Sequence, residues 1–407
     1  MKKQTRTFLS LVLSLCLLIG CSIPMQASAS EDLKAYKIGV AFYQLDAQAI
    51  LVQKYLSEYV GPAFNVEFMF SEAVADVETL INFMENAYAA GCDAIMNYQN
   101  SSIDQAIAKA NELGIYLVTN TTTLADNMDL PYNLGYVAAS VDQCAKDFGT
   151  LVNELMSDGE KHNVIIVSAG AGMGNNEHFE STVAILKTLQ DVYGLTYEDD
   201  IVDLAAVRSE TDVKSDKDIK ITIYPGYPNS DTYVPGMSAL LQTGEYDTLL
   251  ACNAAYAQCS VAIDEVEKAY GIDIRISAIT NISDQTRTNF NTLDSAGNSS
   301  LNSAILMPSA ATAAGMFVLA YNGITGNAEV VRVDGTGIIY SANKWTCRNA
   351  DEYARIEMLN TSDETYEISI DELKEMLVAF NPEATSENIM ATLYGVTVES
   401  VLNARGI

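Results

Sequence analysis

The stretch Tyr36–Gln44 constrains the fold most, because its apolar residues run together instead of alternating with polar ones. Such a run is typical of a strand buried on both faces of a sheet. A helical pattern at Asp46–Tyr59 follows directly, and this order predicts the first half of a right-handed βαβ unit. Ligands of such sheets bind beyond the carboxyl ends of the strands. We therefore expect Phe42 and Tyr43 at the mouth of a cleft; the alternative is that they only fill the core.

The same unit recurs along the chain, with strand patterns separated by helical ones. After the opening strand, a first group of strands is predicted at 65–70, 94–98, 115–119 and 134–138. A second group is predicted at 163–167, 219–224, 248–252 and 274–279. Alternation at this rhythm indicates parallel sheets covered by helices on both faces. The sequence therefore predicts an α/β protein with two doubly wound parallel-sheet lobes in tandem.

The N-terminus has the form of a bacterial export signal, with basic residues before the apolar run Phe8–Gly20. That run is shorter than the roughly 20 residues that a membrane-spanning helix needs. It ends at Cys21, where a lipobox places the cysteine that becomes lipidated. We expect residues 1–20 to be a signal peptide and residues 21–34 a lipidated tether. Cleavage after Ala29, at an Ala-Ser-Ala site, is the competing interpretation.

The chain has 407 residues, enough for more than one domain, and carries a formal net charge of −30. Such an acidic surface repels phosphate backbones, so nucleic acid is not expected as a partner. The cysteines beyond the signal and the lipobox are Cys92, Cys144, Cys252, Cys259 and Cys347. They form no Cys-x-x-Cys pair and lie far from histidines, so a metal site is not expected either. Most have apolar neighbours in the sequence, which predicts buried thiols.

Motifs for catalysis and for cofactors are missing from the sequence. Gly170–Gly174 follows a strand and could cradle a phosphate on a helix N-terminus. No Gly-Lys-Ser/Thr follows it, however, and the last glycine of the dinucleotide pattern is absent. A flexible loop beside a cleft is the interpretation we prefer. Since the sequence also lacks a Gly-x-Ser-x-Gly elbow, we expect neither a cofactor nor an enzymatic activity.

Taken in order, these features resemble the type I solute-binding proteins of bacterial ABC importers, the ribose-binding-like group. The resemblance covers residues 36 to about 348. Its clearest part is Tyr246–Ala257, which is similar to the family's strand ending in Asn-Asp before a helix. Asn253 matches that pattern, whereas Ala254 stands where Asp is usual. A second part, Ser303–Pro308 and the apolar helix after it, is similar to the family's late strand, proline and helix.

The resemblance implies interleaved lobes that close around a ligand by a hinge motion. It assigns residues 35–139 and 308–326 to lobe 1, and residues 140–307 and 327–349 to lobe 2. The chain would cross at about Ala138, near Pro308 and near Gly326, which places the strand Gly337–Ser341 in lobe 2.

Residues 350–407 exceed the usual length of the family, and we expect a helical appendage that packs against a lobe. One of its helices is expected to begin at Ser369, because Glu372 stands three residues later in the spacing of a capping box.

Carried over by position, the resemblance implies a cleft lined by residues that follow the strands of both lobes. From lobe 1 they are Phe42, Tyr43, Asp46, Asn97, Tyr98, Gln99, Asn120, Thr121 and Tyr136. From lobe 2 they are His178, Tyr227, Asn253 and either Thr280 or Asn281. Amides, hydroxyls and tyrosines suit a neutral polar ligand whose apolar faces stack on aromatic rings.

The cleft departs from the sugar binders of this group, which usually hold hydroxyls with one Arg and two Asp residues. The matching positions hold His178, Thr121 and Thr280 or Asn281, and the late-strand Gln is Leu306. Charge-assisted hydrogen bonds are about twice as strong as neutral ones. Their absence weakens the case for a pentose or hexose. The amides, hydroxyls and tyrosines still suit a neutral polar ligand, so we predict a sugar-like solute, with a nucleoside as the alternative.

The resemblance implies a monomeric receptor, lipid-anchored on the outer face of the cytoplasmic membrane, that delivers its solute to an ABC permease. The alternative is a receptor for a nucleoside or autoinducer that presents its closed form to a sensor kinase. An exported enzyme on the same fold is the third candidate, and the missing nucleophile, metal and phosphate motifs argue against it.

Overall fold

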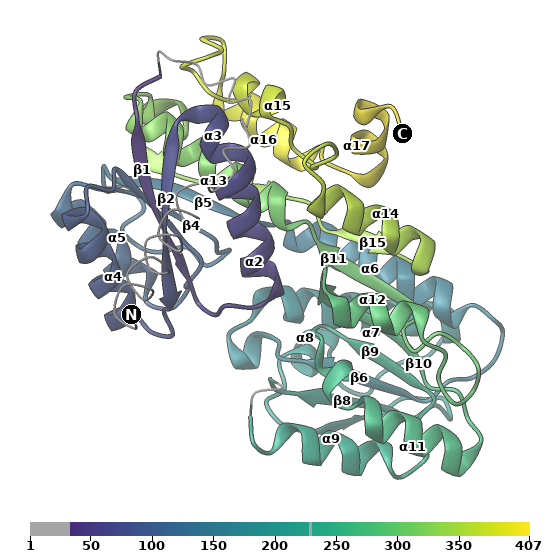
Figure 1. The fold of residues 1–407 in the computed structure, drawn as a ribbon. Coiled ribbons are helices and arrows are strands. Elements are labelled where there is room, and N and C mark those ends of the chain that lie inside the picture. The colour runs from purple at the N-terminus through teal and green to yellow at the C-terminus, as the bar shows by residue number, and fades with distance from the viewer. Residues whose placement is uncertain (1–32, 228–229) are drawn as a thin grey trace, which may run out of the picture.

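The structure is a computed structural model of the chain and describes residues 33–227 and 230–407. In these ranges the chain forms two α/β lobes side by side, with further helices at its C-terminal end (Figure 1). The fold class predicted from the sequence is confirmed. The predicted signal peptide, Cys21 and most of the predicted tether lie outside the described residues. Among the helices of the described ranges, none has the length and apolar character of a membrane span.

The sheet of lobe 1 has the strand order β14-β5-β4-β3-β1-β2, and its strands run parallel. The strands are β1 (Tyr36–Phe42), β2 (Val66–Ala73), β3 (Ala94–Asn97), β4 (Tyr116–Thr119), β5 (Asn133–Ala139) and β14 (Ile339–Ala342). The helices are α2 (Ala47–Lys54), α3 (Gly61–Phe64), α4 (Val77–Ala89), α5 (Ile103–Leu113) and α13 (Ser309–Ile324), with the π-helical turn η1 (Tyr55–Val60) joining α2 to α3. The short elements η3 (Ala328–Val330), β12 (Arg332–Val333) and β13 (Thr336–Gly337) precede β14. As the uninterrupted apolar run predicts, β1 is buried from Ile38 to Phe42.

The sheet of lobe 2 has the strand order β15-β11-β10-β9-β6-β8-β7, parallel except at the two edges. Its strands are β6 (Val164–Ser168), β7 (Thr211–Val213), β8 (Ile221–Pro225), β9 (Thr248–Ala251), β10 (Arg275–Asn281), β11 (Ser303–Met307) and β15 (Trp345–Cys347). Its helices are α6 (Val141–Met156), η2 (Ala171–Met173), α7 (Asn176–Tyr193), α8 (Ile201–Ala205), α9 (Tyr233–Leu241), α10 (Ala255–Gln258), α11 (Ser260–Tyr270) and α12 (Asp284–Asn291). The cysteines of the described ranges are all buried free thiols, which confirms that prediction.

The chain passes between the lobes after β5, after β11 and again between β14 and β15. The last of these passages differs from the predicted one near Gly326. Residues Ile339–Ala342 pair in parallel with Tyr136–Ala139 of lobe 1, so placing Gly337–Ser341 and residues 327–342 in lobe 2 was wrong. The crossing segment is Asn343–Lys344, and of the predicted stretch only β15 joins the sheet of lobe 2.

The pairing of β14 depends on a close backbone contact at Gly135. Its φ of +108° lies in a region that side chains disfavour. A Cβ there would lie 2.4 Å from the carbonyl oxygen of Ile338. The absence of a side chain at Gly135 therefore lets the chain before β14 approach β5 closely. As a result β14 pairs with β5 and becomes an edge strand of lobe 1.

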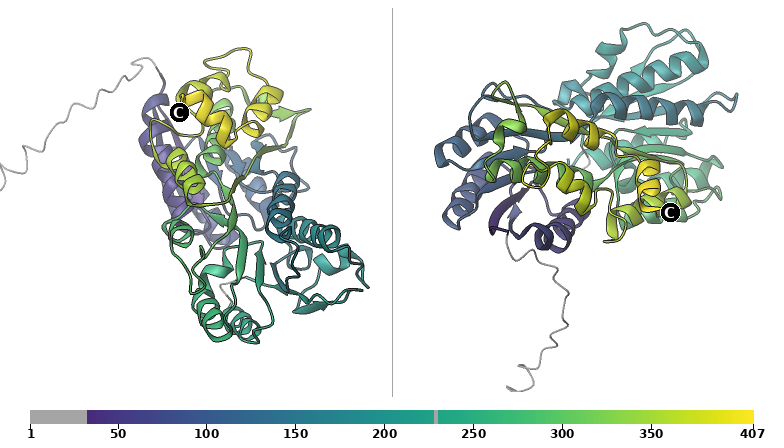
Figure 2. Two further views of the ribbon diagram at one scale, coloured as in Figure 1. Left: turned by 90° about the vertical axis from the view of Figure 1, so that its right-hand side faces the viewer. Right: turned by 90° about the horizontal axis from the view of Figure 1, so that it is seen from above.

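The C-terminal appendage consists of α14 (Ala350–Thr361), α15 (Ile370–Glu375), α16 (Ser386–Tyr394) and α17 (Val398–Arg405). Its capping box at Ser369 and Glu372 is present as predicted. The appendage contacts both lobes rather than one, and Figure 2 shows its helices (yellow) along one side of the molecule. Toward lobe 2, the guanidinium of Arg287 on α12 holds the carboxylate of Glu357 at 2.5 Å, and the hydroxyl of Tyr353 donates to the carbonyl of Ser283 at 2.8 Å.

Toward lobe 1, the appendage completes the N-terminus of α13. Pro308, the residue before α13, offers no side-chain cap. Instead, Asn360 Oδ1 accepts from the backbone N–H of Ser309 at 3.0 Å, and Glu367 Oε1 accepts from that of Ala311 at 2.9 Å. The first backbone N–H groups of a helix lack partners within it, so the appendage supplies the acceptors that the local sequence does not.

Candidate functional site

A cleft of about 380 Å³ lies between the lobes, where the carboxyl ends of strands from both sheets meet. From lobe 1 it is lined by Gln48, Asn100, Asn120, Thr121, Thr122, Thr123, Ala138 and Ala139. From lobe 2 and the last crossing come Gly174, Asn175, Asn176, Glu177, Tyr227, Asn281, Met307 and Lys344. A second pocket of about 160 Å³ in lobe 1 shares the lining residues Gln48 and Asn120 with the cleft and therefore adjoins it. Amide and hydroxyl groups dominate the lining of the cleft.

The smaller pocket is built on aromatic rings at the end of β1. Phe42 stacks on Tyr98 with ring centroids 5.2 Å apart, and Phe42 itself is buried. Tyr43, 47% exposed, also lines the pocket. Asp46 lines it as well, but its carboxylate caps α2 by accepting from the backbone N–H of Ala49 at 2.9 Å. A ligand here would meet an exposed ring, while Asp46 mainly fixes the helix start.

Three of the predicted residues support the loops that carry others into the cleft. Asn97 is fully buried, and its side chain donates to the backbone carbonyl of Gln99 at 2.7 Å and accepts from its N–H at 2.9 Å. Gln99 in turn accepts from the backbone N–H of Ser101 at 2.9 Å. Neither side chain lines the cleft or the pocket. Asn120 lines both, and its amide also donates to the carbonyl of Val137 at 2.8 Å.

On the lobe 2 side, the glycine loop leads to the N-cap Asn175, whose amide donates to the hydroxyl of Tyr227 at 3.3 Å. Both line the cleft. The predicted His178 is buried behind this loop, where Nδ1 accepts from the backbone N–H of Ala169 at 3.2 Å. Burial lowers the pKa of His178 to about 4, so the imidazole is neutral at neutral pH and holds the loop in place.

For the other predicted residues, the position relative to the end of a strand decides whether the side chain lines the cleft. Thr121 and Asn281 line the cleft, whereas Thr280, one residue earlier on β10, is buried. Asn253 is half-buried beyond the end of β9 and lines neither the cleft nor the pocket. Tyr136 was wrongly predicted to face the cleft. It lies in mid-strand on β5, fully buried in the core shared with α4 and α5, and the cleft begins at Ala138.

Two charged residues of the cleft were not among the predicted ones. Glu177 stands in the first turn of α7, directly before His178, so the predicted site residue is the neighbour of the one that lines the cleft. Lys344 lies in the last crossing, which was predicted near Gly326. Its Nζ lies 2.5 Å from Glu177 Oε1. The sequence around Lys344, directly before β15, contains no local pattern that indicates a cleft-lining residue paired with Glu177.

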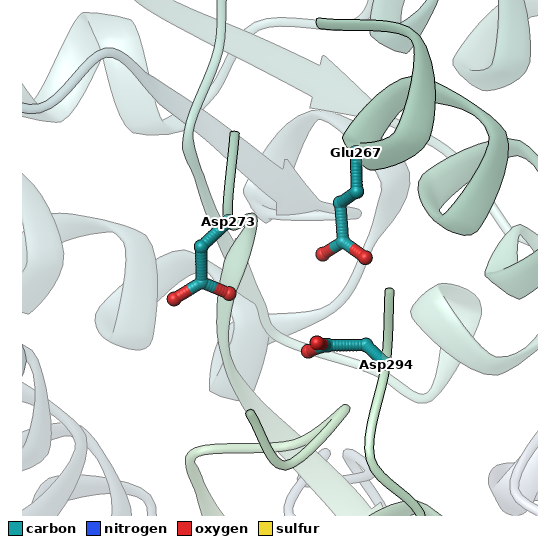
Figure 3. A group of neighbouring side chains, drawn as sticks. All are labelled: Glu267, Asp273 and Asp294. Carbon is teal, nitrogen blue, oxygen red and sulfur yellow. The ribbon is translucent and has the colours of Figure 1, made fainter. Parts of the chain in front are cut away.

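A separate group of carboxylates, Glu267, Asp273 and Asp294, lies at the amino end of β10, opposite the cleft (Figure 3). One oxygen of each carboxylate lies within 4.8 Å of one oxygen of each of the other two. Burial, together with the negative charges of Asp294 and Asp273, raises the pKa of Glu267. Both oxygens of Glu267 already accept hydrogen bonds, from the backbone N–H of Ile274 and from the hydroxyl of Ser295. Protein groups therefore satisfy the most buried member of this acidic group.

No protein-family model and no curated protein sequence matches this chain. Solved structures do match it. An ABC transporter solute-binding protein from Bacillus halodurans C-125 with bound myo-inositol is 15% identical, with a TM-score of 0.55, over 81% of this chain and 99% of that one. A periplasmic solute-binding protein from Actinobacillus succinogenes 130z with bound D-allose is 14% identical, with a TM-score of 0.57, over 78% and 99%.

A third similar structure is an ABC transporter solute-binding protein from Clostridium phytofermentas with bound L-rhamnose. It is 11% identical, with a TM-score of 0.54, over 80% of this chain and 99% of that one. These matches cover the neighbours almost completely. They confirm that the chain has the type I periplasmic binding protein fold, which the resemblance implied.

Proposed function

We propose that this chain, with its type I periplasmic binding protein fold, captures a small neutral sugar-like solute between its lobes and delivers it to an ABC permease. One observation carries the proposal. The interlobe cleft is lined by amides and hydroxyls from both sheets, and its charged lining residues, Glu177 and Lys344, balance each other. Binding needs only that the lobes close on the ligand, so no reaction is required of the site. Similar folds hold myo-inositol, D-allose and L-rhamnose.

The proposal is tested by thermal shift of residues 33–407 against neutral sugars, polyols, nucleosides and amino acids. A ligand at about 100 times its Kd stabilises the folded state by roughly 2.7 kcal/mol, and we expect a sugar or polyol to do so. Tyr43→Ala should weaken binding about tenfold, because a stacking ring contributes roughly 0.5–1.5 kcal/mol beyond its buried area. Tyr88→Ala on α4 is the matched control, since Tyr88 is 51% exposed and lines neither pocket.

A nucleoside as the best ligand would favour the receptor that signals through a sensor kinase. Absence of a shift with every neutral solute, at concentrations up to 10 mM, would contradict the proposed function. Equal binding by the Tyr43 and Tyr88 variants would remove the smaller pocket from the site.

We further propose that the protein is held at the outer face of the cytoplasmic membrane by lipid on Cys21. The proposal is supported by the basic start, the apolar run Phe8–Gly20 and the cysteine at its end. Two or three acyl chains hold a protein stably on a membrane, whereas a single chain gives only marginal membrane binding. In a bacterial host that processes lipoproteins, we expect labelled palmitate in the wild-type protein and none in Cys21→Ser. Palmitate incorporation by Cys21→Ser would contradict the assignment, and release after Ala29 would support ordinary cleavage.

A further inference from the structure

The charged pair in the cleft joins the last interlobe crossing to lobe 2. Lys344 lies in the segment between β14 of lobe 1 and β15 of lobe 2, and Glu177 lies in the first turn of α7. The side chains are 10% and 21% exposed, respectively, and Nζ lies 2.5 Å from Oε1. Both line the cleft. A ligand that touches this pair therefore touches both lobe 2 and a segment that connects the two lobes.

Both members of the pair are ionised at neutral pH. Burial alone would raise the pKa of Glu177, but the charge of Lys344 and the hydrogen bond from it outweigh burial and hold the pKa below its usual range. Burial would likewise lower the pKa of Lys344, and Glu177 raises it instead. Removing two charges from water offsets much of what their attraction returns, so apolar side chains of similar volume often stabilise a fold as well as a buried ion pair does. Stability is therefore a poor explanation for placing this pair in a ligand-sized cleft.

The chemistry of the pair fits vicinal hydroxyl groups. An ionised carboxylate only accepts hydrogen bonds and an ammonium only donates them, whereas a hydroxyl does both. One hydroxyl can donate to Glu177 while its neighbour accepts from Lys344, and such charge-assisted bonds are about twice as strong as neutral ones. A ligand carboxylate could pair with Lys344 only by displacing Glu177, and a ligand ammonium could pair with Glu177 only by displacing Lys344. Either exchange leaves the displaced side chain as a buried charge without its partner, which is strongly unfavourable. Like charges brought together in a site disfavour binding strongly.

We propose that the Glu177–Lys344 pair determines the specificity of the cleft: it selects an uncharged solute with adjacent hydroxyl groups and rejects the sugar acids and amino sugars of similar shape. The inference rests on the proposed function. It also replaces the expectation that the cleft lacks charge-assisted partners. The charged groups that sugar binders carry at other positions are supplied here from the first turn of α7 and from the crossing segment.

The test measures Kd by isothermal titration for residues 33–407. The probes are myo-inositol, D-allose, L-rhamnose, D-glucose and D-galactose, with D-glucuronate, D-galacturonate, D-glucosamine and D-galactosamine as charged counterparts. Trp345, the single tryptophan of the chain, follows Lys344 directly and gives a fluorescence readout of the same titrations. For the wild-type protein we expect every charged probe to bind at least about 100-fold more weakly than the best neutral one.

The double variant Glu177→Gln/Lys344→Met removes both charges, so neither partner is left buried and unpaired. We expect it to keep its melting temperature to within a few degrees and to lose about 30-fold or more in affinity for the best neutral solute. The matched control is Glu85→Gln/Lys109→Met, which removes an ion pair of 3.1 Å between α4 and α5, away from the cleft. Its affinity should equal that of the wild type.

Two results would overturn the inference while the proposed function stands: binding of a uronate or amino sugar as tight as the best neutral solute, or unchanged affinity in the Glu177/Lys344 double variant. The first comparison uses the wild-type protein alone, so it holds even if the double variant fails to fold. A wild-type protein that binds none of the neutral probes or other neutral solutes would instead contradict the proposed function itself.

Discussion

Deletion of residues 350–407 is expected to abolish cooperative folding of both lobes. The appendage covers aromatic side chains of lobe 1: Tyr366 packs edge-on against Tyr55 at 4.8 Å between ring centroids, and Phe380 packs against Phe64 at 5.4 Å. Burying one such side chain stabilises a fold by about 1.5–3 kcal/mol. Exposing several such side chains would cost a free energy that approaches the whole stability of a typical domain, about 5–15 kcal/mol.

The same deletion removes the hydrogen-bond acceptors for the buried start of α13. The N–H groups of Ser309 and Ala311 would lose Asn360 and Glu367, and the amide of Asn322 would lose the carbonyl of Met376. Each buried group left without a partner costs about 1–3 kcal/mol. The appendage is therefore expected to be part of the folding unit.

The measurement is thermal unfolding followed by circular dichroism, comparing residues 33–349 with residues 33–407. The control ends at residue 397 and removes only α17, which buries Val401 alone among its side chains. That control should still unfold cooperatively, a few degrees lower. A cooperative transition in the shorter protein within about 5 °C of the full one would show that the appendage is dispensable.

Glu367→Gln is expected to stabilise the protein at alkaline pH and to flatten its dependence on pH. Glu367 is 1% exposed, and Oε2 has no hydrogen-bond partner among the described residues. Burial raises its pKa to about 8, against about 4.3 in an unfolded chain. The folded protein therefore keeps a proton that the unfolded chain has released. Stability from this group is fully present below about pH 4 and is lost as the pH rises through about 8.

In that window the loss amounts to about 1.4 kcal/mol per pH unit. Glutamine keeps an oxygen for the N–H of Ala311 and has no proton to lose. We expect the free energy of unfolding of Glu367→Gln, relative to that of the wild type, to increase by about 2 kcal/mol from about pH 6.5 to about pH 8. Urea titration at the two pH values measures this difference. Groups such as His178 titrate alike in both proteins, so the difference isolates Glu367. The control is Glu364→Gln, at an exposed position three residues earlier, and its free energy of unfolding should depend on pH as that of the wild type does. If the free energies of unfolding of Glu367→Gln and the wild type ran parallel with pH, the assignment of Glu367 as a buried protonated carboxyl would be contradicted.

Much of the fold could be predicted because its signals are local. Apolar runs and helical spacing placed strands such as β1 and β6 within a residue or two, and the capping box at Ser369 marked the start of α15. The ends of strands also indicated cleft residues: Tyr43, Asn120, Thr121 and Asn281 do line the cleft or its adjoining pocket. The prediction for Tyr136 was wrong because Tyr136 lies inside its strand, both as predicted at 134–138 and as observed, where its side chain is buried in the core.

What the sequence determined by itself was therefore the order of strands and helices, the two-lobed α/β class and the carboxyl-end location of the cleft. Each of these depends on residues that are neighbours along the chain. The tertiary structure decided that β14 joins lobe 1, that Lys344 meets Glu177 in the cleft, and that the appendage caps α13. These are contacts between segments roughly 50 to 200 positions apart, and the partner of a strand edge, a charge or a helix end is not encoded in its local pattern.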